Sequence, residues 1–380
     1  MDTTDRLADL LGQLTRADEV QAALLALPPD ALRDAATSFE ARDFAPGESL
    51  VEESSEDVDA ILLLVEGEAT AAVRPSTPEG RAGEPQVVGR LGPLDVVGEI
   101  GLVLRTPRTA TVRAETAVRA LSIRRDPLAR LMQTCPDIAN AVVRWCAQNA
   151  ADKIGRTRRL HREGYPEGLS LKDAPGPGGS IMLETDFAEG AAERNYAEVG
   201  AKTTGILRGR LQELRCFEWD AASITAPVAE LFRLVKVPSR RAIVSEGEPG
   251  ESVLILSRGI ANIRQRDGEL VHGWVAGHQK PVHTLVGEMT FLSPGPRTGT
   301  VLASTACELL ELSTAQVPDL ARRAPWVAQH LHLGLLRAVC PKLAETSAYR
   351  ATIEAVAQGD WEQWFVDDDY YTRKLKALEH

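Results

Sequence analysis

Two segments of the chain carry the same chemically active residues at the same spacing. In each, Val-Gly-Glu is followed after seven residues by Pro-Arg-Thr-x-Thr-Val, first over 97–112 and again over 286–301. The offset between the copies is 189 residues (97 to 286), and 12 of 27 positions aligned from there onward are identical. The repeat predicts a duplicated domain, and its residue types indicate what each copy binds.

The chemistry of the motif suits an anion beside a sugar. Glycine followed by glutamate favours a short helical turn whose first backbone N–H groups can bind an anion that approaches closely. The arginine nine residues after the glutamate, Arg108 or Arg297, has the planar guanidinium that pairs with phosphate oxygens. A carboxylate is a poor partner for phosphate but accepts hydrogen bonds from sugar hydroxyls. The motif therefore indicates a nucleotide with few charges.

Both copies resemble the phosphate-binding cassette of cyclic nucleotide-binding domains, the family of bacterial catabolite activator proteins, protein kinase A regulatory subunits and cyclic nucleotide-gated channels. That family has the pattern Phe-Gly-Glu-Leu-Ala-Leu followed by Pro-Arg-x-Ala-Thr-Val. The first copy reads Val-Gly-Glu-Ile-Gly-Leu and Pro-Arg-Thr-Ala-Thr-Val, and the second reads Val-Gly-Glu-Met-Thr-Phe and Pro-Arg-Thr-Gly-Thr-Val. Upstream of the second copy, the segment 244–250 also resembles the family's early β-turn.

The resemblance implies a role for each motif residue. Glu99 and Glu288 would accept the ribose 2′-hydroxyl, and Arg108 and Arg297 would pair with the cyclic phosphate. The backbone N–H groups expected to complete the phosphate cradle belong to Gly98, Ile100 and Gly101 in the first copy and to Gly287, Met289 and Thr290 in the second.

Thr109 and Thr298 follow the arginines, where the family can place a hydroxyl against the phosphate or a purine edge. In eukaryotic kinases and channels a threonine there goes with cGMP, and in bacterial activators a hydroxyl there goes with cAMP. Both ligands therefore stay open, with a slight preference for cAMP. The second copy departs from the family at Thr290, where a small residue is expected, and at Phe291. We expect two sites of unequal affinity, the first being the stronger; the alternative is that one or both copies keep only the fold.

Short apolar runs separated by Gly, Pro and acidic turns surround each motif, and helical patterns follow them. Together with the resemblance, this predicts an α+β protein with two cyclic nucleotide-binding domains, each a β-roll (a double-stranded β-helix, jelly-roll-like) with flanking helices. The predicted division is an N-terminal helix at 1–21, a first domain at 22–163, a linker and connecting helix at 164–222, a second domain at 223–357, and an acidic, aromatic tail at 358–380 that ends in a probable vector remnant.

The periodicity also predicts individual elements. Strands are expected at 49–51, 60–65, 69–73, 86–89, 109–113, 117–123, 241–244, 252–257, 260–264 and 270–275. Helices are expected over 1–40, 126–132, 136–163, 187–217, 228–234 and 315–355. In the family the C-terminal helices close over the base, so 137–163 and 326–355 are the expected moving parts. Trp145 or Trp326 could cap a purine there, with core packing as the alternative role.

Composition narrows the function further. The net charge of −11 argues against nucleic acid as the main partner, because duplex binding needs a concentrated basic surface. The five cysteines are scattered without a CxxC pair, which indicates neither a zinc site nor a disulfide framework. With no signal sequence and no bilayer-spanning run, the sequence indicates a cytoplasmic protein that does not use a membrane. No catalytic Ser/His/Asp or Cys/His set stands out, so we do not expect an enzyme.

The sequence therefore predicts a receptor for cAMP or cGMP, without another cofactor or a metal, that relays ligand binding through helix movement to a protein partner. The identity of that partner, cooperativity between the sites and a homodimer stay open. Two alternatives remain. One is a DNA-binding regulator like the catabolite activators, although no helix-turn-helix pattern is found. The other is a scaffold protein in which one or both sites are inactive.

Overall fold

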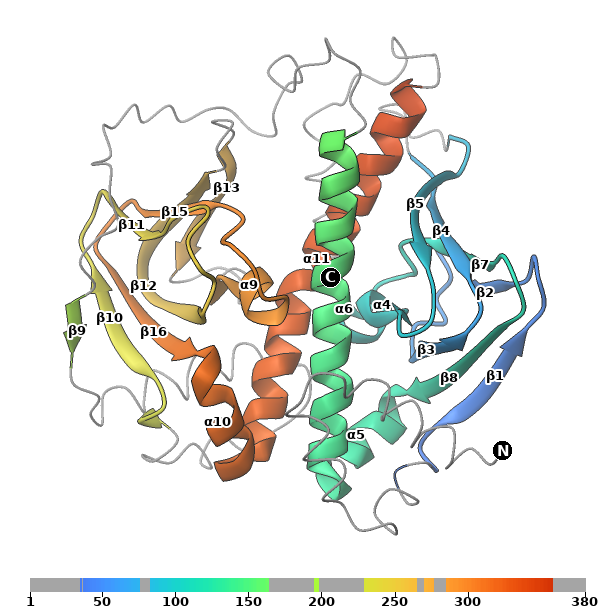
Figure 1. Ribbon diagram of the computed structural model, residues 1–380, viewed down its shortest axis with the longest axis horizontal. Coiled ribbons are helices and arrows are strands. Elements are labelled where there is room, and N and C mark those ends of the chain that lie inside the picture. Colours follow the sequence, from blue (N-terminus) through green and yellow to red (C-terminus); the bar gives the residue numbers. More distant parts are fainter. Residues whose placement is uncertain are drawn as a thin grey trace. The chain divides into compact units, whose positions relative to one another are not determined.

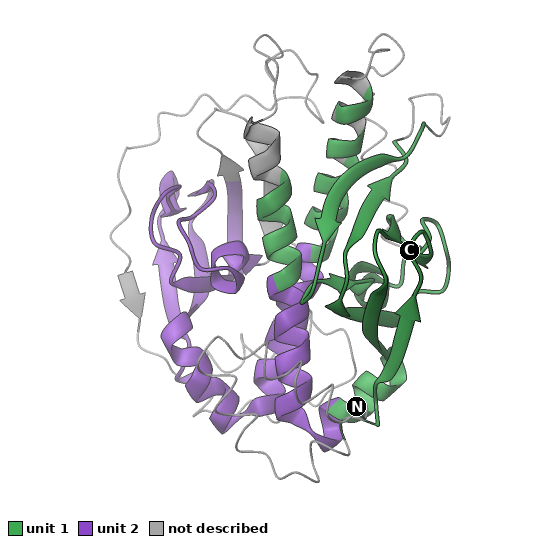
Figure 2. Cartoon of the chain, turned by 45° about the vertical axis from the view of Figure 1, so that its right-hand side comes forward, with its two compact units in different colours: residues 1–131, 149–182, 340–380 green, residues 132–148, 183–339 purple. Residues whose placement is uncertain are grey.

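The chain folds into two compact units whose segments interleave along the sequence (Figure 2). The computed structural model describes residue 35 and residues 37–75, 83–163, 195–197, 229–264, 270–276 and 285–357. Unit 1 comprises Met1–Leu131, Asn149–Met182 and Cys340–His380, and unit 2 comprises Met132–Gln148 and Leu183–Val339. Two long helices, α6 (Pro136–Glu163) and α11 (Pro325–Ala357), pass from one unit to the other within their lengths. The boundaries expected from the sequence, in contrast, run consecutively.

Unit 1 contains a β-roll made of two antiparallel four-stranded sheets, ordered β1-β8-β3-β6 and β2-β7-β4-β5 (Figure 1). The strands are β1 (Glu40–Phe44), β2 (Ser49–Val51), β3 (Ala60–Glu66), β4 (Ala69–Val73), β5 (Gln86–Leu91), β6 (Val96–Val97), β7 (Thr111–Ala114) and β8 (Val118–Arg124). One buried cluster joins Leu62 and Ala120 of the first sheet to Leu50 and Val112 of the second. Small and branched side chains from both sheets fill most of this core, and Phe44 of β1 adds an aromatic ring.

Unit 2 repeats the roll with its strands joined in one eight-stranded sheet. The strands are β9 (Asn195–Ala197), β10 (Arg233–Val237), β11 (Arg241–Val244), β12 (Ser252–Arg264), β13 (Leu270–Ala276), β14 (Leu285–Val286), β15 (Thr300–Ala303) and β16 (Cys307–Ser313). β12 pairs with β14 and β16 along its first part and with β13 and β15 along its second part. The two strands expected at 252–257 and 260–264 are therefore one continuous strand.

A glycine with a positive φ occupies the corresponding position in each roll. Gly67 has a φ of 91°, and Gly259 has a φ of 109°. A Cβ would lie 2.2 Å from the carbonyl oxygen of Ala117 at the first glycine, and 2.7 Å from that of Ala306 at the second. Both positions therefore require glycine for backbone conformation and for space.

The fold corrects three helix predictions. Glu40 begins strand β1 instead of ending the helix expected over 1–40. β9 lies inside the helix expected over 187–217, and β10 replaces the end of the helix expected over 228–234. Short apolar runs in the sequence do not distinguish a helix from a strand. In the structure, β10 forms a strand because it pairs with both β9 and β16. The described residues do not include 1–34, the remainder of 187–217 or the tail 358–380.

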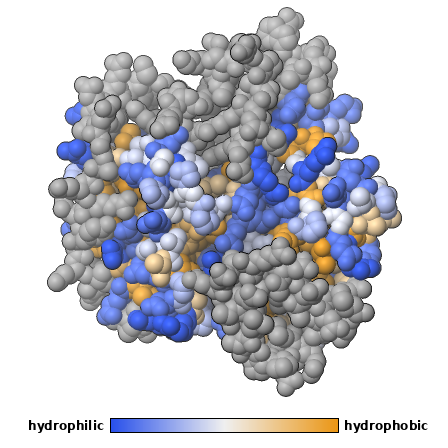
Figure 3. Space-filling view, in the orientation of Figure 1, coloured by the Kyte–Doolittle hydropathy of each residue, from blue (hydrophilic) through white to orange (hydrophobic). Residues whose placement is uncertain are grey.

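The described helices are α4 (Glu99–Leu104), α5 (Arg125–Thr134), α6, α9 (Glu288–Leu292), the 3₁₀ turn η4 (Thr314–Gln316), α10 (Val317–Arg323) and α11. In α6, Ile138, Val142 and Val143 are buried and lie on the inward-facing side of the helix. Among the parts of the chain that the structure describes, no helix has the length and hydrophobicity that crossing a bilayer requires. The described surface in Figure 3 mixes hydrophilic residues with separate hydrophobic patches.

A fully buried histidine makes the stability of unit 2 sensitive to acid. The Nδ1 atom of His332, on α11, lies 2.8 Å from the Oδ1 atom of Asn140 on α6. Burial, with a smaller contribution from the positive charge of Arg144, lowers the pKa of His332 to about 3. The usual pKa is about 6.5, so between these values the unfolded chain binds a proton that the folded chain does not. Folding stability is therefore complete above the unfolded pKa and falls as pH decreases.

We expect the His332→Gln variant to lose less stability in acid than the unaltered protein does. Between about pH 7.5 and pH 5, the loss caused by His332 is about 2 kcal/mol. Urea denaturation at both pH values measures it, and the variant should lack this part of the loss. Burial also lowers the pKa of His330, which contributes in the same direction in both proteins. An equal acid loss with and without His332 would contradict the assignment.

Candidate functional site

The first copy of the motif forms a tight turn and a short helix in unit 1. Gly98 precedes α4 with a φ of 94°, and no side chain caps the helix there. A Cβ on Gly98 would lie 2.3 Å from Nη1 of Arg108 and 2.9 Å from the carbonyl oxygen of Ala60. Only glycine leaves room for the guanidinium against this backbone. The local sequence therefore places the arginine beside the start of α4, as predicted.

Arg108 is buried and held by three backbone carbonyls. Its Nε, Nη1 and Nη2 atoms donate hydrogen bonds of 2.9 Å each to the carbonyl oxygens of Asp57, Gly98 and Ala60. Burial lowers the pKa of Arg108, and the nearby carboxylates of Asp57, Glu99 and Asp59 oppose that shift. Three of the five N–H groups of a guanidinium are used in this way. The side chain is thus fixed in one orientation before any ligand arrives, and it lies in the wall of a pocket.

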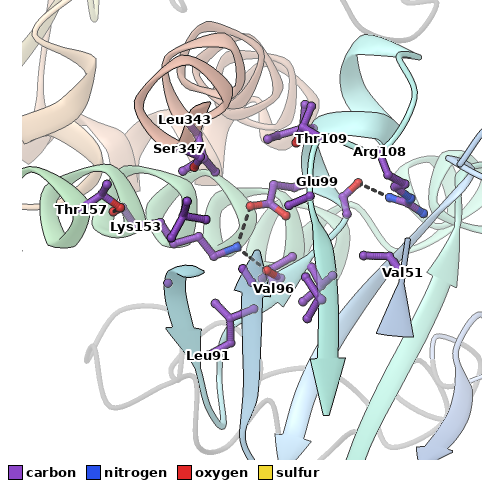
Figure 4. A pocket seen from close by; sticks show the side chains of 18 of the residues that line it. Val51, Leu91, Val96, Glu99, Arg108, Thr109, Lys153, Thr157, Leu343 and Ser347 are labelled. Carbon is purple, nitrogen blue, oxygen red and sulfur yellow. Dashed lines mark hydrogen bonds and ion pairs between the residues drawn. The ribbon is translucent and has the colours of Figure 1, made fainter. Parts of the chain in front are cut away.

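Glu99, the predicted ribose acceptor, is paired with a lysine from α6 (Figure 4). Nζ of Lys153 lies 2.7 Å from Oε1 of Glu99 and also donates to the carbonyl oxygen of Val96. The side chains of Glu99 and Lys153 are only 4% and 14% exposed. The carboxylate is therefore buried and oriented by a lysine that sequence reasoning missed.

A polar cluster fixes the part of α6 that carries Lys153. Asn149 accepts a hydrogen bond from the N–H of Val96 and donates one to Asp95, and Arg156 pairs with the same carboxylate at 2.7 Å. Burial alone would raise the pKa of Asp95, but hydrogen bonds from Arg156, Gly92 and Asn149 leave it below the usual value. These contacts hold α6 against β6 on both sides of the lysine.

The pocket of unit 1 has a volume of about 440 Å³, within the usual range for small-molecule sites. Its lining comes from the β-roll, the motif, α6 and the end of α11 (Figure 4). The motif contributes Gly98, Glu99, Ile100, Gly101, Arg108 and Thr109. Val87 also lines it, and among the described residues it is the one large hydrophobic side chain that is exposed, at 50%. A buried cation, a buried carboxylate and an apolar wall thus share one cavity.

The second copy has the same backbone but different contacts. Gly287 precedes α9 with a φ of 82°, and Nη1 of Arg297 donates to its carbonyl oxygen at 3.2 Å. The same Nη1 donates to Oγ1 of Thr290 at 2.8 Å, and Nη2 donates to Oγ of Ser252 at 3.2 Å. Ser252 in turn donates to Glu311 at 2.9 Å. Two side-chain hydroxyls and one backbone carbonyl therefore accept from Arg297, whereas three backbone carbonyls accept from its counterpart in unit 1.

Thr290 places a side chain beside the arginine where the first copy has a glycine, and a Cβ on that glycine, Gly101, would lie 3.0 Å from the Val58 side chain. A Cβ on Gly250 would lie 2.2 Å from the Thr290 side chain, which is itself 4% exposed. The first copy has Gly101 at the position of Thr290, so no side chain reaches Arg108 there. The other predicted residues of the second copy keep their places: Glu288 is buried at the start of α9, Met289 follows it, and Thr298 follows Arg297.

The predicted purine caps do not lie in the described pocket. Trp145 is 9% exposed within unit 2, and Trp326 packs edge-on against His330 with ring centroids 6.3 Å apart. Neither tryptophan is among the residues that line the pocket of unit 1. Core packing, the alternative role, fits Trp145. Among the residues that the structure describes, no cluster of three His, Cys, Asp or Glu side chains is arranged to hold a metal ion.

Sequence reasoning missed the residues that α6 and α11 contribute. Lys153, Arg156 and Thr157 come from α6, and Leu343, Ser347 and Arg350 come from α11. No local motif identifies these residues, because the orientation of a long helix about its axis determines which of its side chains face the pocket. From the sequence alone, a lysine and two arginines on predicted helices are assigned to the solvent-exposed faces of those helices.

Comparison with known proteins agrees with the geometry. The family model for the cyclic nucleotide-binding domain matches residues 41–135 and 234–324. A cAMP-bound PfPKA-R structure (141–441) is 16% identical, with 86% of each chain covered and a TM-score of 0.31. The regulatory domain of Toxoplasma gondii PKA with cAMP is 19% identical, covers 86% of this chain and 94% of that one, and has a TM-score of 0.28.

A third structure is the regulatory subunit of a cAMP-independent protein kinase A from Trypanosoma cruzi bound to guanosine. It is 16% identical, covers 84% of this chain and 88% of that one, and has a TM-score of 0.27. These likenesses are distant, so the assignment rests on the family model and on the two motifs. Each family match contains one copy of the repeat on one β-roll, and the chain is therefore a tandem cyclic nucleotide-binding domain protein.

Proposed function

We propose that this protein is a receptor for cAMP or cGMP and that the pocket of unit 1 is its principal binding site. The observation that supports this most directly is the content of one cavity: a fixed guanidinium, a buried carboxylate and an exposed apolar side chain. The cyclic phosphate binds Arg108 and the backbone N–H groups of Ile100 and Gly101. Glu99 accepts the ribose 2′-hydroxyl, and the base covers Val87.

The pairing of Glu99 with Lys153 supports a relay through α6. A 2′-hydroxyl that donates to Glu99 changes the charge distribution around the carboxylate that orients Lys153. Because Lys153 belongs to α6, the free energy of ligand binding is coupled to the position of this helix. Because the ligand makes different contacts in different arrangements of α6, its binding favours one arrangement, and a protein partner recognises that arrangement.

We test the function by titrating the full-length protein with cAMP and cGMP in a calorimeter, with non-cyclic 5′-AMP as the control. Saturable heat with a cyclic nucleotide but not with 5′-AMP supports the proposal. Identifying the nucleotide released when the purified protein is denatured gives an independent answer on the base. If neither cyclic nucleotide produces heat or raises the melting temperature of a protein that was purified free of nucleotide, the proposal is refuted.

The second domain is expected to bind the same ligand more weakly. Before Arg297 can pair fully with a phosphate, its Nη1 atom must give up the buried 2.8 Å hydrogen bond to Thr290. Hydrogen bonds to a charged group contribute about 1.5–3 kcal/mol, which corresponds to about a 10- to 100-fold loss of affinity. The Thr290 hydroxyl thus accepts the hydrogen bond from Arg297 that a phosphate oxygen of the ligand would otherwise accept.

Removing that hydroxyl should strengthen the second site. We expect Thr290→Ala to raise the affinity of the second site for cAMP by about tenfold. Thr290→Ser is the matched control, because it keeps the hydroxyl and should leave the second site weak. Calorimetry on both variants measures the change as a second, tighter binding event. An affinity that is the same in Thr290→Ala and Thr290→Ser would contradict this role of the hydroxyl.

A further inference from the structure

Helix α11 passes from unit 2 into unit 1 next to a proline in its interior. Val339 is the last residue of α11 in unit 2, and Cys340 is the first in unit 1. Pro341 follows directly, inside the helix. Proline has no N–H to donate, and its ring conflicts with the carbonyl four residues earlier, so the helix is weakest at this point. The segment after Pro341 can therefore change direction relative to the part of α11 before it.

That terminal segment is built into the first β-roll. Leu343, Ser347 and Arg350 line the pocket of unit 1, and their spacing of four and three residues places them on one helix face. Nη1 of Arg350 donates to the carbonyl oxygen of Val88 at 3.2 Å, and Nη2 lies 3.5 Å from Glu354. The segment follows the second β-roll in the sequence, yet it forms a wall of the pocket in unit 1.

An apolar contact anchors the same segment beyond the pocket. Ala351 is fully buried in a cluster with Val73 and Val88, the two partners coming from β4 and β5. A residue larger than alanine would not fit this contact without displacing the helix. The segment is thus attached to the roll by one apolar contact and one hydrogen bond, both next to the pocket lining.

The wall supplies a chemical group suited to the remaining part of the ligand. The motif and Lys153 provide the charged groups that suit phosphate and ribose, and the roll provides apolar surface. In Figure 4, Leu343 and Ser347 lie on the side of Glu99 away from Arg108, toward Thr157 of α6. A serine hydroxyl can donate to or accept from the polar edge of a base, and the leucine beside it packs on a flat ring.

We propose that the α11 segment after Pro341 completes the nucleotide site of the first domain, with Ser347 contacting the edge of the nucleobase. This rests on the proposed function of the same pocket. Its consequence is that residues after the second β-roll set the affinity and the base preference of the first domain. The helix that carries Ser347 begins in unit 2 and ends in unit 1.

Substitutions on one turn of α11 test the contact. We expect Ser347→Ala to weaken the tighter of cAMP and cGMP by about tenfold and to reduce the ratio between them, because the lost hydrogen bond is specific to one base edge. Ser347→Leu should weaken both ligands more strongly by filling the cavity. The matched control is Thr346→Ala, which removes a hydroxyl that bonds only to the carbonyl oxygen of Lys342 among the described residues. Equal affinities in all three variants would overturn the proposal.

Hydrogen exchange tests the position of the response. Saturating cAMP should slow amide exchange in peptides from 342–357 more than in peptides from 325–339, with the boundary at Pro341. The Arg108→Lys variant separates this inference from the proposed function. Binding that requires Arg108 but leaves exchange after Pro341 unchanged overturns the role of α11 alone. Absence of cyclic nucleotide binding in the unaltered protein overturns both.

Discussion

Arg108→Lys should weaken cyclic nucleotide binding at the first site by about a hundredfold or more. Arg108 donates at once to three carbonyl oxygens that lie in different directions, and its planar fork holds the remaining N–H groups for phosphate. Lysine keeps the charge but presents a single ammonium on a flexible stem. It cannot reach Asp57, Gly98 and Ala60 together and still pair with two phosphate oxygens. Calorimetric titration with cAMP measures the loss.

The same change should also reduce stability, because it leaves buried carbonyl groups without donors. Each such group costs about 1–3 kcal/mol, so the melting temperature of the variant should fall as well. Binding is therefore measured at a temperature where circular dichroism shows the variant to be folded. Arg113→Lys is the matched control, since Arg113 is exposed on β7 of the same roll. Affinity within threefold of the unaltered protein in Arg108→Lys would contradict the assigned role.

The motif could be located from sequence because its requirements are local. A glycine with positive φ, a glutamate at the start of a short helix and an arginine that folds back on that glycine all lie within one turn and one loop. The repetition at a constant offset added evidence that no single copy provides. In the structure Gly98, Glu99 and Arg108 lie in the wall of one pocket, and the β-rolls expected from the same pattern are present.

The rest of the site depends on long-range packing, which no local pattern records. Lys153 is separated from Glu99 by 54 residues, and Ser347 lies on α11, after the second β-roll. A one-residue rotation of either helix would direct a different side chain into the pocket. The start of β10 falls in the helix expected over 228–234 for a related reason: a short apolar run fits both periods, and pairing with β9 and β16 selects the strand.

The ion pair between Glu99 and Lys153 leads to a prediction that separates stability from binding. Glu99→Gln leaves a mostly buried ammonium without its carboxylate, and Lys153→Met leaves a buried carboxylate without its cation. Breaking a buried pair on one side costs about 3 kcal/mol, and slightly less for Glu99→Gln because Lys153 keeps the Val96 carbonyl. We therefore expect each single variant to be clearly less stable in urea denaturation.

The double variant, Glu99→Gln with Lys153→Met, should recover most of that stability, because no buried charge is left unpaired. It should still bind cAMP at least about tenfold more weakly, since a neutral amide is a poorer acceptor for the 2′-hydroxyl than a carboxylate. If stability is recovered while affinity is lost, the Glu99–Lys153 pair contributes to ligand binding and not to the stability of the fold. A double variant as unstable as the two single losses added together would show that the two side chains are not coupled. Glu99 would then act on the ligand without involving α6, and the relay through this helix would have no physical basis.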